Sequence, residues 1–259
     1  MQDLKIALVQ ADQIWEDKTA NWNHYMELLS GLRSQVDLIL LPEMFDTGFS
    51  MNTSLAEEWE DSNSSLQFLR RISKNNDAAV YTSIMCKEKG NFYNRGVFVY
   101  PDGSISFYDK RKTFGLAGEN RIFTAGTEEK IIDFNGWKIL LQICYDLRFP
   151  EICRNRMSED KLPAYDLLLY VANWPERRSV HWKTLLQARA IENQCYVVGV
   201  NRVGIDGHDI PYSGDSVCVT ALGETEWCES NEETIKMVEL SNLALNQTRL
   251  ALPFLQDRE

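Results

Sequence analysis

Apolar runs alternate with amphipathic stretches along the first third of the chain. Residues 4–10 and 36–43 form runs of the length expected for buried strands. Between them, apolar side chains recur at spacings of three and four, which predicts an amphipathic helix: Trp22, Tyr25, Met26, Leu29 and Leu32. A second helix from about Ser64 leads into a strand over residues 77–86. This order predicts successive βαβ units.

The rest of the chain is richer in strands. Residues 96–110 alternate between apolar and polar on both sides of Pro-Asp-Gly, which predicts an antiparallel hairpin. A helix is expected over residues 179–194, with Ser179 as its N-cap. Further strands are expected at residues 137–144, 165–174, 195–201, 215–220 and 234–240. Parallel and antiparallel pairing are therefore both expected.

These elements predict an α/β sandwich, in which helices pack outside two mixed sheets that face each other. No low-complexity tract, internal repeat or linker rich in Pro, Gly or Ser divides the sequence. We therefore expect residues 1–259 to form a single domain.

The composition and net charge limit the classes of binding partner that the protein is expected to have. The chain has 259 residues, is 44% hydrophobic, and carries a net charge of −11. This charge repels phosphate backbones and anionic lipid, which argues against nucleic acid or membrane as a partner and favours a small molecule or another protein. No apolar run reaches the ~18 residues of a membrane span, and the first residues read as a strand. A cytoplasmic protein is expected.

The metal-binding residue types are sparse. The six cysteines contain no C-x-x-C pair, which favours reduced thiols over a disulfide framework. The three histidines lie outside helical spacing of one another, so no metal site is predicted. The glycine-containing segment 204–215 lacks the phosphate-loop pattern, and no cofactor is predicted.

Three chemically useful side chains occupy equivalent positions in the pattern. Glu43, Lys110 and Cys144 each stand where a predicted strand gives way to a loop. The crevice at the carboxyl ends of strands is the usual ligand site of α/β sheets. Each residue also has a simpler interpretation: Glu43 as a loop acid, Lys110 as a solvated base and Cys144 as a small buried thiol. Together they supply what amide cleavage through a thiol requires, namely a nucleophile, a base and a positive charge for the oxyanion.

The residues after Cys144 add to this hypothesis. Pro150 fits the first turn of a helix, which would place the thiol close to a helix N-terminus and lower its pKa. The backbone N–H of Tyr145 would then be free to face an oxyanion.

The motifs that carry these residues resemble the nitrilase superfamily of carbon–nitrogen hydrolases over nearly the whole chain. They are LPEMFDTGF, FYDKRKTFGLAGENRIFTAG, ICYDLRFPE and the long stretch that begins LYVANWPERRSVHW. The resemblance implies that Glu43 is the general base, that Lys110 supports the tetrahedral intermediate and that Cys144 carries the acyl group. It implies that Glu119 orients the lysine or the substrate, although a loop or helix-start acid is an equal alternative. It also implies a four-layer α-β-β-α sandwich and a homodimer.

Within the superfamily, the same motifs are most similar to the omega-amidase branch. That branch removes ammonia from 2-oxoglutaramate and related amides, through a thioester on the cysteine. Relatives that cleave nitriles, N-carbamoyl compounds or deaminated glutathione use the same three residues, and they remain the alternatives.

An anionic substrate needs a cation in an acidic protein. The candidates are Arg148, Arg177 and Arg178, and the expected aromatic walls are Phe45, Tyr145 and Trp174. For Arg148 we favour a different interpretation, an ion pair with Asp146 or Glu151 that braces the chain after Cys144.

Two rival hypotheses differ in class. In a Cys-His hydrolase, Cys144 would be served by His181 or His208, but no local signature of such enzymes is present. A non-catalytic binding domain would be expected to have lost at least one of the three residues, and all three are present.

Overall fold

Two mixed β-sheets form the centre of the computed structural model, which describes residues 2–32, 35–158 and 161–258. The first sheet has the order β15-β1-β2-β4-β5-β6, with β3 paired beside β4. Its strands are β1 (Leu4–Gln10), β2 (Leu38–Leu40), β3 (Glu57–Glu58), β4 (Ala79–Glu88), β5 (Asn91–Val99), β6 (Ile105–Asp109) and β15 (Thr234–Leu240). β1, β2 and β4 are parallel, whereas β15 and the β4-β5-β6 meander pair antiparallel.

The second sheet has the order β14-β13-β10-β9-β8-β7. Its strands are β7 (Ile131–Phe134), β8 (Trp137–Ile143), β9 (Leu167–Ala172), β10 (Tyr196–Asn201), β13 (Val217–Val219) and β14 (Thr225–Trp227). β8, β9 and β10 are parallel, and the outer pairs are antiparallel. A separate ribbon joins β11 (Val203–Ile205) to β12 (Pro211–Ser213).

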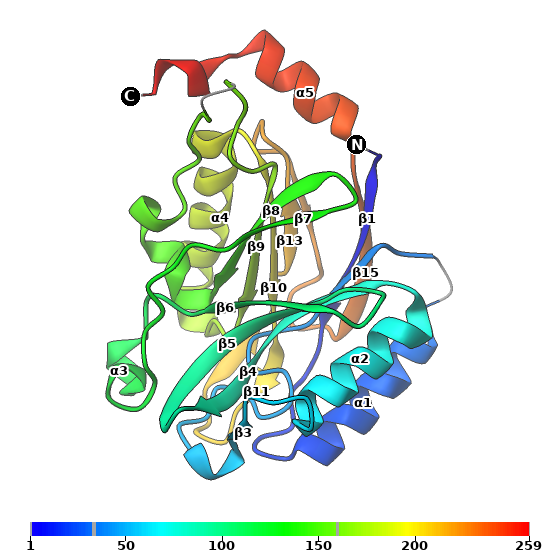
Figure 1. The fold of residues 1–259 in the computed structure, drawn as a ribbon, viewed down its shortest axis with the longest axis vertical. Helices are drawn as coiled ribbons and strands as arrows, with labels where there is room; N and C mark the ends of the chain where they lie inside the picture. The colour runs from blue at the N-terminus through cyan, green and yellow to red at the C-terminus, as the bar shows by residue number, and fades with distance from the viewer. Residues whose placement is uncertain (1, 33–34, 159–160, 259) are drawn as a thin grey trace.

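The alternation of side chains explains the layers. In β1, Leu4, Ile6 and Leu8 lie in the core shared with the second sheet. Ala7 and Val9 point the other way, toward α1 (Lys18–Ser30) and α2 (Ser64–Asn76), which lie side by side over the first sheet (Figure 1). Because successive residues of a strand face opposite sides, a strand buried on both faces must be apolar throughout. This is why the middle of β1, from Ile6 to Val9, is an uninterrupted apolar run.

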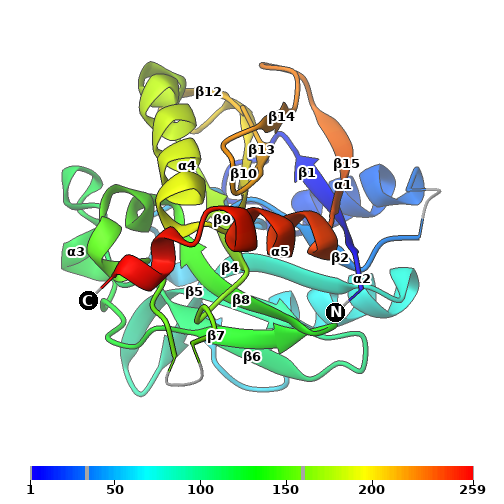
Figure 2. The same cartoon turned by 90° about the horizontal axis from the view of Figure 1, so that it is seen from above.

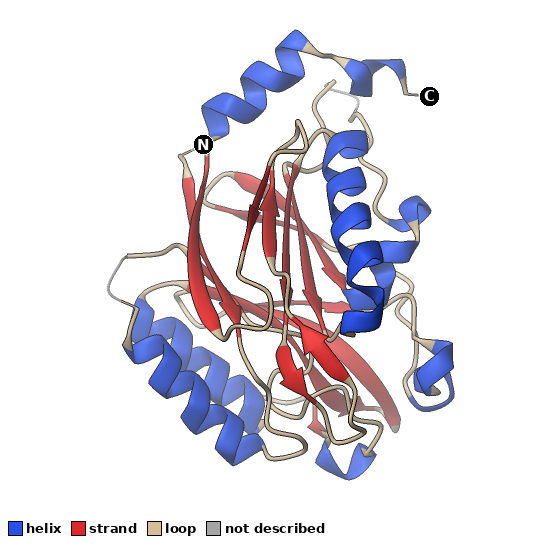
Figure 3. Ribbon diagram, turned by 180° about the vertical axis from the view of Figure 1, so that it is seen from behind, coloured by secondary structure: helices blue, strands red, loops and turns tan. Residues whose placement is uncertain are grey.

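The helix α4 (Ser179–Asn193) covers the outer face of the second sheet (Figure 3). It packs closely against β10, where a Cβ on Gly199 would come within 2.8 Å of Leu186 and 2.9 Å of Trp182. The strand therefore needs a glycine there. The predicted four-layer sandwich of two mixed sheets is confirmed.

Some local predictions were wrong. Arg178, not Ser179, is the N-cap of α4, and the Ser179 hydroxyl instead donates to Asp215 at 2.6 Å. The expected helix after Pro150 is only a three-residue 3-10 turn, Pro150–Ile152. The sequence pattern missed α5 (Asn242–Ala251), which crosses above the sheets (Figure 2) and buries only Leu245. One buried side chain leaves little periodicity to detect.

The remaining elements are short. They are α3 (Glu119–Ile122) and the 3-10 helices Thr53–Leu55, Gly115–Ala117, Cys144–Arg148, Glu176–Arg178 and Phe254–Asp257. Within the described ranges, no helix is both long and apolar enough to cross a membrane.

Candidate active site

Strand ends from both sheets bring the three predicted residues together. Glu43 follows β2, Lys110 directly follows β6, and Cys144 directly follows β8 of the other sheet. Glu43 is fully buried, Lys110 is 1% exposed and Cys144 is 8% exposed. The site therefore lies at one end of the sandwich, where the two sheets meet.

Lys110 lies between two carboxylates. Its ammonium donates to Glu43 Oε1 at 2.8 Å and to both carboxylate oxygens of Glu119 at 3.0 Å. Burial alone would lower the pKa of Lys110, but the charges of Glu119 and Glu43 outweigh it and raise the pKa above its ordinary value. Lys110 is therefore a permanent cation and not a base.

Glu119 is the first residue of α3, as its helix-start interpretation expected, and it also holds the lysine. Its Oε2 accepts a short hydrogen bond from the backbone N–H of Phe114. The carboxylate is fully buried, so these donors fix its position. Glu119 is thus placed to orient Lys110.

Two asparagines, which the sequence analysis missed, complete the network. Asn94 Nδ2 in β5 donates to Glu43 Oε1 at 2.8 Å and to Glu119 Oε1 at 3.0 Å. The backbone N–H of Asn173 donates to Glu43 Oε2 at 2.9 Å. Asn173 directly follows β9, so the strand-end pattern that selected the other residues would also have found it. Asn94 lies inside a strand and gave no such signal.

Cys144 sits at a sharp bend between β8 and the 3-10 helix Cys144–Arg148. Its φ of 44° lies in the left-handed region, which costs an L-residue roughly 1–2 kcal/mol. Asp146 holds the bend by accepting hydrogen bonds from the Ile143 N–H at 3.0 Å and the Tyr108 hydroxyl at 2.9 Å. The Cys144 side chain lines a cavity, and backbone strain of this kind clusters at functional sites.

The expectation of a lowered thiol pKa was wrong. Burial, followed by the negative charge of Glu43, raises the pKa of Cys144 well above its ordinary value, although Lys110 opposes the shift. The 3-10 turn at Pro150 is too short to present a helix macrodipole. The resting thiol is therefore protonated, and the chemistry requires a base to take its proton.

We expect iodoacetamide still to modify Cys144 before the other cysteines, because its side chain lines the cavity, whereas the others are 0–5% exposed. The alkylation rate should rise with pH through about pH 8.5, the ordinary thiol value, since the folded pKa lies higher. Mass mapping of the labelled peptides over a pH series measures both. A rate plateau below pH 8 would contradict the raised pKa.

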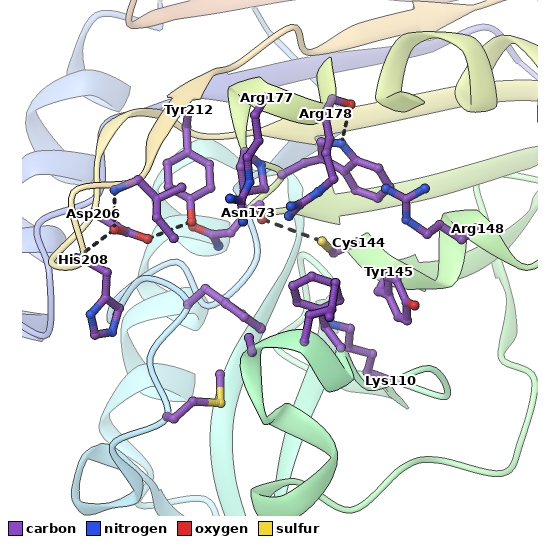
Figure 4. A pocket seen from close by; sticks show the side chains of 18 residues that line it. Lys110, Cys144, Tyr145, Arg148, Asn173, Arg177, Arg178, Asp206, His208 and Tyr212 are labelled. Carbon is purple, nitrogen blue, oxygen red and sulfur yellow. Dashed lines mark hydrogen bonds between the residues drawn. The ribbon is translucent and has the colours of Figure 1, made fainter. Parts of the chain in front are cut away.

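Cys144 lines a cavity of about 290 Å³ (Figure 4), a volume close to the lower end of the size range of ligand sites. Five of the six predicted substrate-binding residues line it: Tyr145, Arg148, Trp174, Arg177 and Arg178. The prediction for Phe45 was wrong. Phe45 is fully buried between the rings of Tyr25 and Phe68, beneath α1 and α2, and Phe49 lines the cavity instead.

The favoured interpretation of Arg148 was also wrong. Its guanidinium lies 4.6 Å from the centre of the Trp174 ring and donates to His181 Nδ1 at 3.2 Å. Asp146 is occupied by the donors of the bend, and Glu151 pairs with Lys112 at 3.4 Å. Arg148 therefore belongs to the cavity wall.

The ribbon of β11 and β12 supplies a wall that the sequence analysis missed. The cavity is also lined by Asp206, His208 and Tyr212, and the Tyr212 hydroxyl donates a hydrogen bond to Asp206 at 2.8 Å.

The two histidines of the Cys-His hypothesis have other partners. The centres of the His208 and Trp15 rings lie 5.1 Å apart, and His181 contacts Arg148. The thiol itself donates weakly to the Asn173 carbonyl at 3.8 Å and interacts with the charges of Glu43 and Lys110. This arrangement favours the Glu-Lys-Cys hypothesis over the Cys-His rival.

Comparisons with known proteins agree with this geometry. The sequence pattern of the carbon–nitrogen hydrolase family matches residues 5–248. The chain is 44% identical to the omega-amidase YafV of Yersinia enterocolitica, over 100% of this chain and 98% of that protein. It is 32% identical to the 2-oxoglutaramate amidase of Paenarthrobacter nicotinovorans, over 98% of this chain and 89% of that protein.

A solved structure is similar throughout. XC1258 from Xanthomonas campestris, a CN-hydrolase superfamily protein with an arsenic adduct in its active site, superposes with a TM-score of 0.96. It is 38% identical, over 100% of this chain and 98% of that one. The chain belongs to the carbon–nitrogen hydrolase family, and the predicted resemblance is confirmed.

Proposed function

We propose that the protein is an omega-amidase that hydrolyses 2-oxoglutaramate, or a close 2-oxo dicarboxylic acid monoamide, to the dicarboxylate and ammonia. The observation that carries this proposal is the buried Glu43–Lys110–Glu119 network beside Cys144, at the base of a cavity with arginines in its wall. The network suits amide cleavage, and the arginines suit an anionic substrate. Full-length similarity to omega-amidases supports the same assignment.

Acylation begins with a proton transfer. Glu43 accepts the thiol proton as Cys144 Sγ attacks the amide carbon, which matches a thiol that is protonated at rest. The oxyanion forms next to the Lys110 ammonium and the backbone N–H of Tyr145. The C–N bond then breaks, Glu43 returns the proton to the nitrogen, and ammonia leaves behind a thioester.

Deacylation reuses the same groups. Glu43 takes a proton from water, and the hydroxide attacks the thioester carbonyl, whose oxyanion again faces Lys110. The C–S bond breaks, and the proton returns from Glu43 to the sulfur. The product forms as the carboxylic acid and loses its remaining proton to water, so the dicarboxylate is released. Glu119 acts by holding Lys110, with Asn94 fixing both carboxylates.

The test is a comparison of substrates on the wild-type chain. We expect 2-oxoglutarate and ammonia to be released rapidly from 2-oxoglutaramate, and little ammonia from glutamine or an N-carbamoyl amino acid. Glutamine carries a 2-ammonium group where the substrate has an oxo group, so it serves as the matched control for the 2-oxo acid. Faster turnover of the carbamoyl compound, with release of carbon dioxide, would assign another branch of the family.

We further propose that residues 1–259 act as one hydrolase domain in a cytoplasmic homodimer. The single-domain assignment is supported by the pairing of β1 with β15, which joins the two ends of the chain. The proposed cytoplasmic location is supported by the six free cysteines, which suit a reducing compartment.

The proposed dimer is supported by exposed apolar side chains on α4 and the C-terminal segment: Val180, Ile191, Leu250 and Phe254. Sedimentation of the purified chain at a monomer mass would contradict this pairing.

A further inference from the structure

Arg178 occupies a fixed position at the start of α4. Its carbonyl accepts a hydrogen bond from Trp174 Nε1 at 2.8 Å, and its N–H donates to the Pro175 carbonyl at 3.0 Å. These two bonds hold the backbone, so the side chain starts from a constrained point. Figure 4 shows this side chain reaching into the cavity toward Cys144.

The Arg178 guanidinium differs from the other interior arginines. Its centre lies 5.3 Å from that of the Phe114 ring, and across residues 2–32, 35–158 and 161–258 no carboxylate is paired with it. Burial and the charge of Arg177 lower the pKa of Arg178, as expected for a cation without a counterion. By contrast, the buried arginines have carboxylate partners: Arg95 with Asp109, Arg189 with Glu192, and Arg202 with Asp12.

The neighbouring arginines are less suited to bind a ligand. Arg148 already donates to His181 and lies over Trp174. Arg177 is exposed, so its charge is hydrated and screened. Arg178 is half-buried and interacts electrostatically with Cys144. Among the three arginines of the cavity, Arg178 is therefore the cation best placed to pair with an anionic ligand beside the thiol.

We propose that Arg178 binds the substrate carboxylate and so determines specificity for omega-amides of dicarboxylic acids. This inference rests on the proposed function and deepens it. In an extended five-carbon monoamide, the amide carbon and the carboxylate carbon lie roughly 5 Å apart. A substrate acylating Cys144 thus carries its anion elsewhere in the same small cavity, where a planar guanidinium can bind it in a bidentate manner.

Ligand protection provides the test, because it does not depend on turnover. The probe is 2-oxoglutarate, and the readout is the rate at which iodoacetamide alkylates Cys144. Arg178→Gln removes the charge, Arg178→Lys keeps the charge but loses the bidentate geometry, and Arg177→Gln removes the adjacent exposed charge. Arg71→Gln, on the surface of α2, is the matched control for the chemical change.

We expect Arg178→Gln to need roughly 10- to 100-fold more 2-oxoglutarate for half-protection, the range of a charged hydrogen bond. The lysine variant should fall in between, and Arg177→Gln should change protection only a few-fold, with less effect in high salt. Melting temperatures should match wild type, and the alkylation rate of each variant without ligand serves as its own reference, because Arg178 also interacts with the thiol. Together these two measurements separate ligand binding from a structural role. On 2-oxoglutaramate, the loss should be larger in KM than in kcat.

Unchanged protection in Arg178→Gln, or no protection of the wild type by 2-oxoglutarate, would overturn the inference. Failure of the proposed function has a different signature. If the wild type does not hydrolyse 2-oxoglutaramate, while protection by 2-oxoglutarate still depends on Arg178, the carboxylate site stands and the substrate assignment falls.

Discussion

Replacing Lys110 by methionine is expected to lower the free energy of unfolding by about 3–5 kcal/mol, the usual cost of removing one partner of a buried ion pair. Glu43 and Glu119 are both fully buried and both accept from the Lys110 ammonium. Methionine keeps most of the volume, so the loss reports charge and not packing. Turnover should also fall to near background, because the cation beside the oxyanion is gone.

Denaturant unfolding of purified variants measures the stability change. Lys87→Met is the matched control, because Lys87 forms an ion pair with Glu58 at 2.6 Å on the surface, and such pairs contribute about 0–1 kcal/mol. Adding Glu119→Gln to the Lys110 variant should recover part of the stability, since one buried negative charge is removed, but not the activity. Equal losses from Lys110→Met and Lys87→Met would show that the network is not a buried ion cluster.

Replacing Cys144 by alanine is expected to abolish turnover while the protein stays folded, because no other described nucleophile adjoins Glu43 and Lys110 in the cavity. Wild-type enzyme quenched in acid during turnover should carry an acyl group on Cys144, detectable by intact mass, which the alanine variant lacks. Residual activity above about one part in 10³ of wild type, far beyond what a missing covalent nucleophile allows, would remove Cys144 from the mechanism.

The same position tests the strain at the bend. Glycine adopts a positive φ readily, whereas alanine at φ 44° keeps the strain. The free energy of unfolding of Cys144→Gly should therefore be about 1 kcal/mol higher than that of Cys144→Ala. Both variants should be inactive. A glycine variant less stable than the alanine variant would mean that the bend carries no strain.

The errors of the sequence analysis have a common origin in irregular segments. Glu43 was found because it follows an apolar run, but Phe45 was misplaced two residues later. The intervening Met44 has a φ of 44°, so the chain turns and directs Phe45 under the helices and Phe49 to the cavity. Outside regular elements, no period relates sequence position to side-chain direction.

The thiol pKa and the pairing of Arg148 were misjudged for a related reason. Both depend on groups that are remote in sequence: Glu43 for the thiol, and Trp174 and His181 for the arginine. Local sequence suggested Pro150, Asp146 and Glu151 because they were adjacent. Electrostatic interactions follow distance in space, which adjacency in the chain does not fix.

The sequence by itself determined the longer strands, the two-sheet sandwich and the candidate catalytic residue types at the strand ends, because burial imposes a short, local period on the chain. The short strands β3, β7, β11, β12 and β14 carry too few residues to show such a period. The tertiary structure alone decided the surroundings of those residues. It joins Glu43 to Lys110 across 67 positions, adds Asn94 between the carboxylates, keeps the thiol protonated and leaves Arg178 without a counterion. These properties arise from distances between separate strands and loops, and no local pattern encodes them.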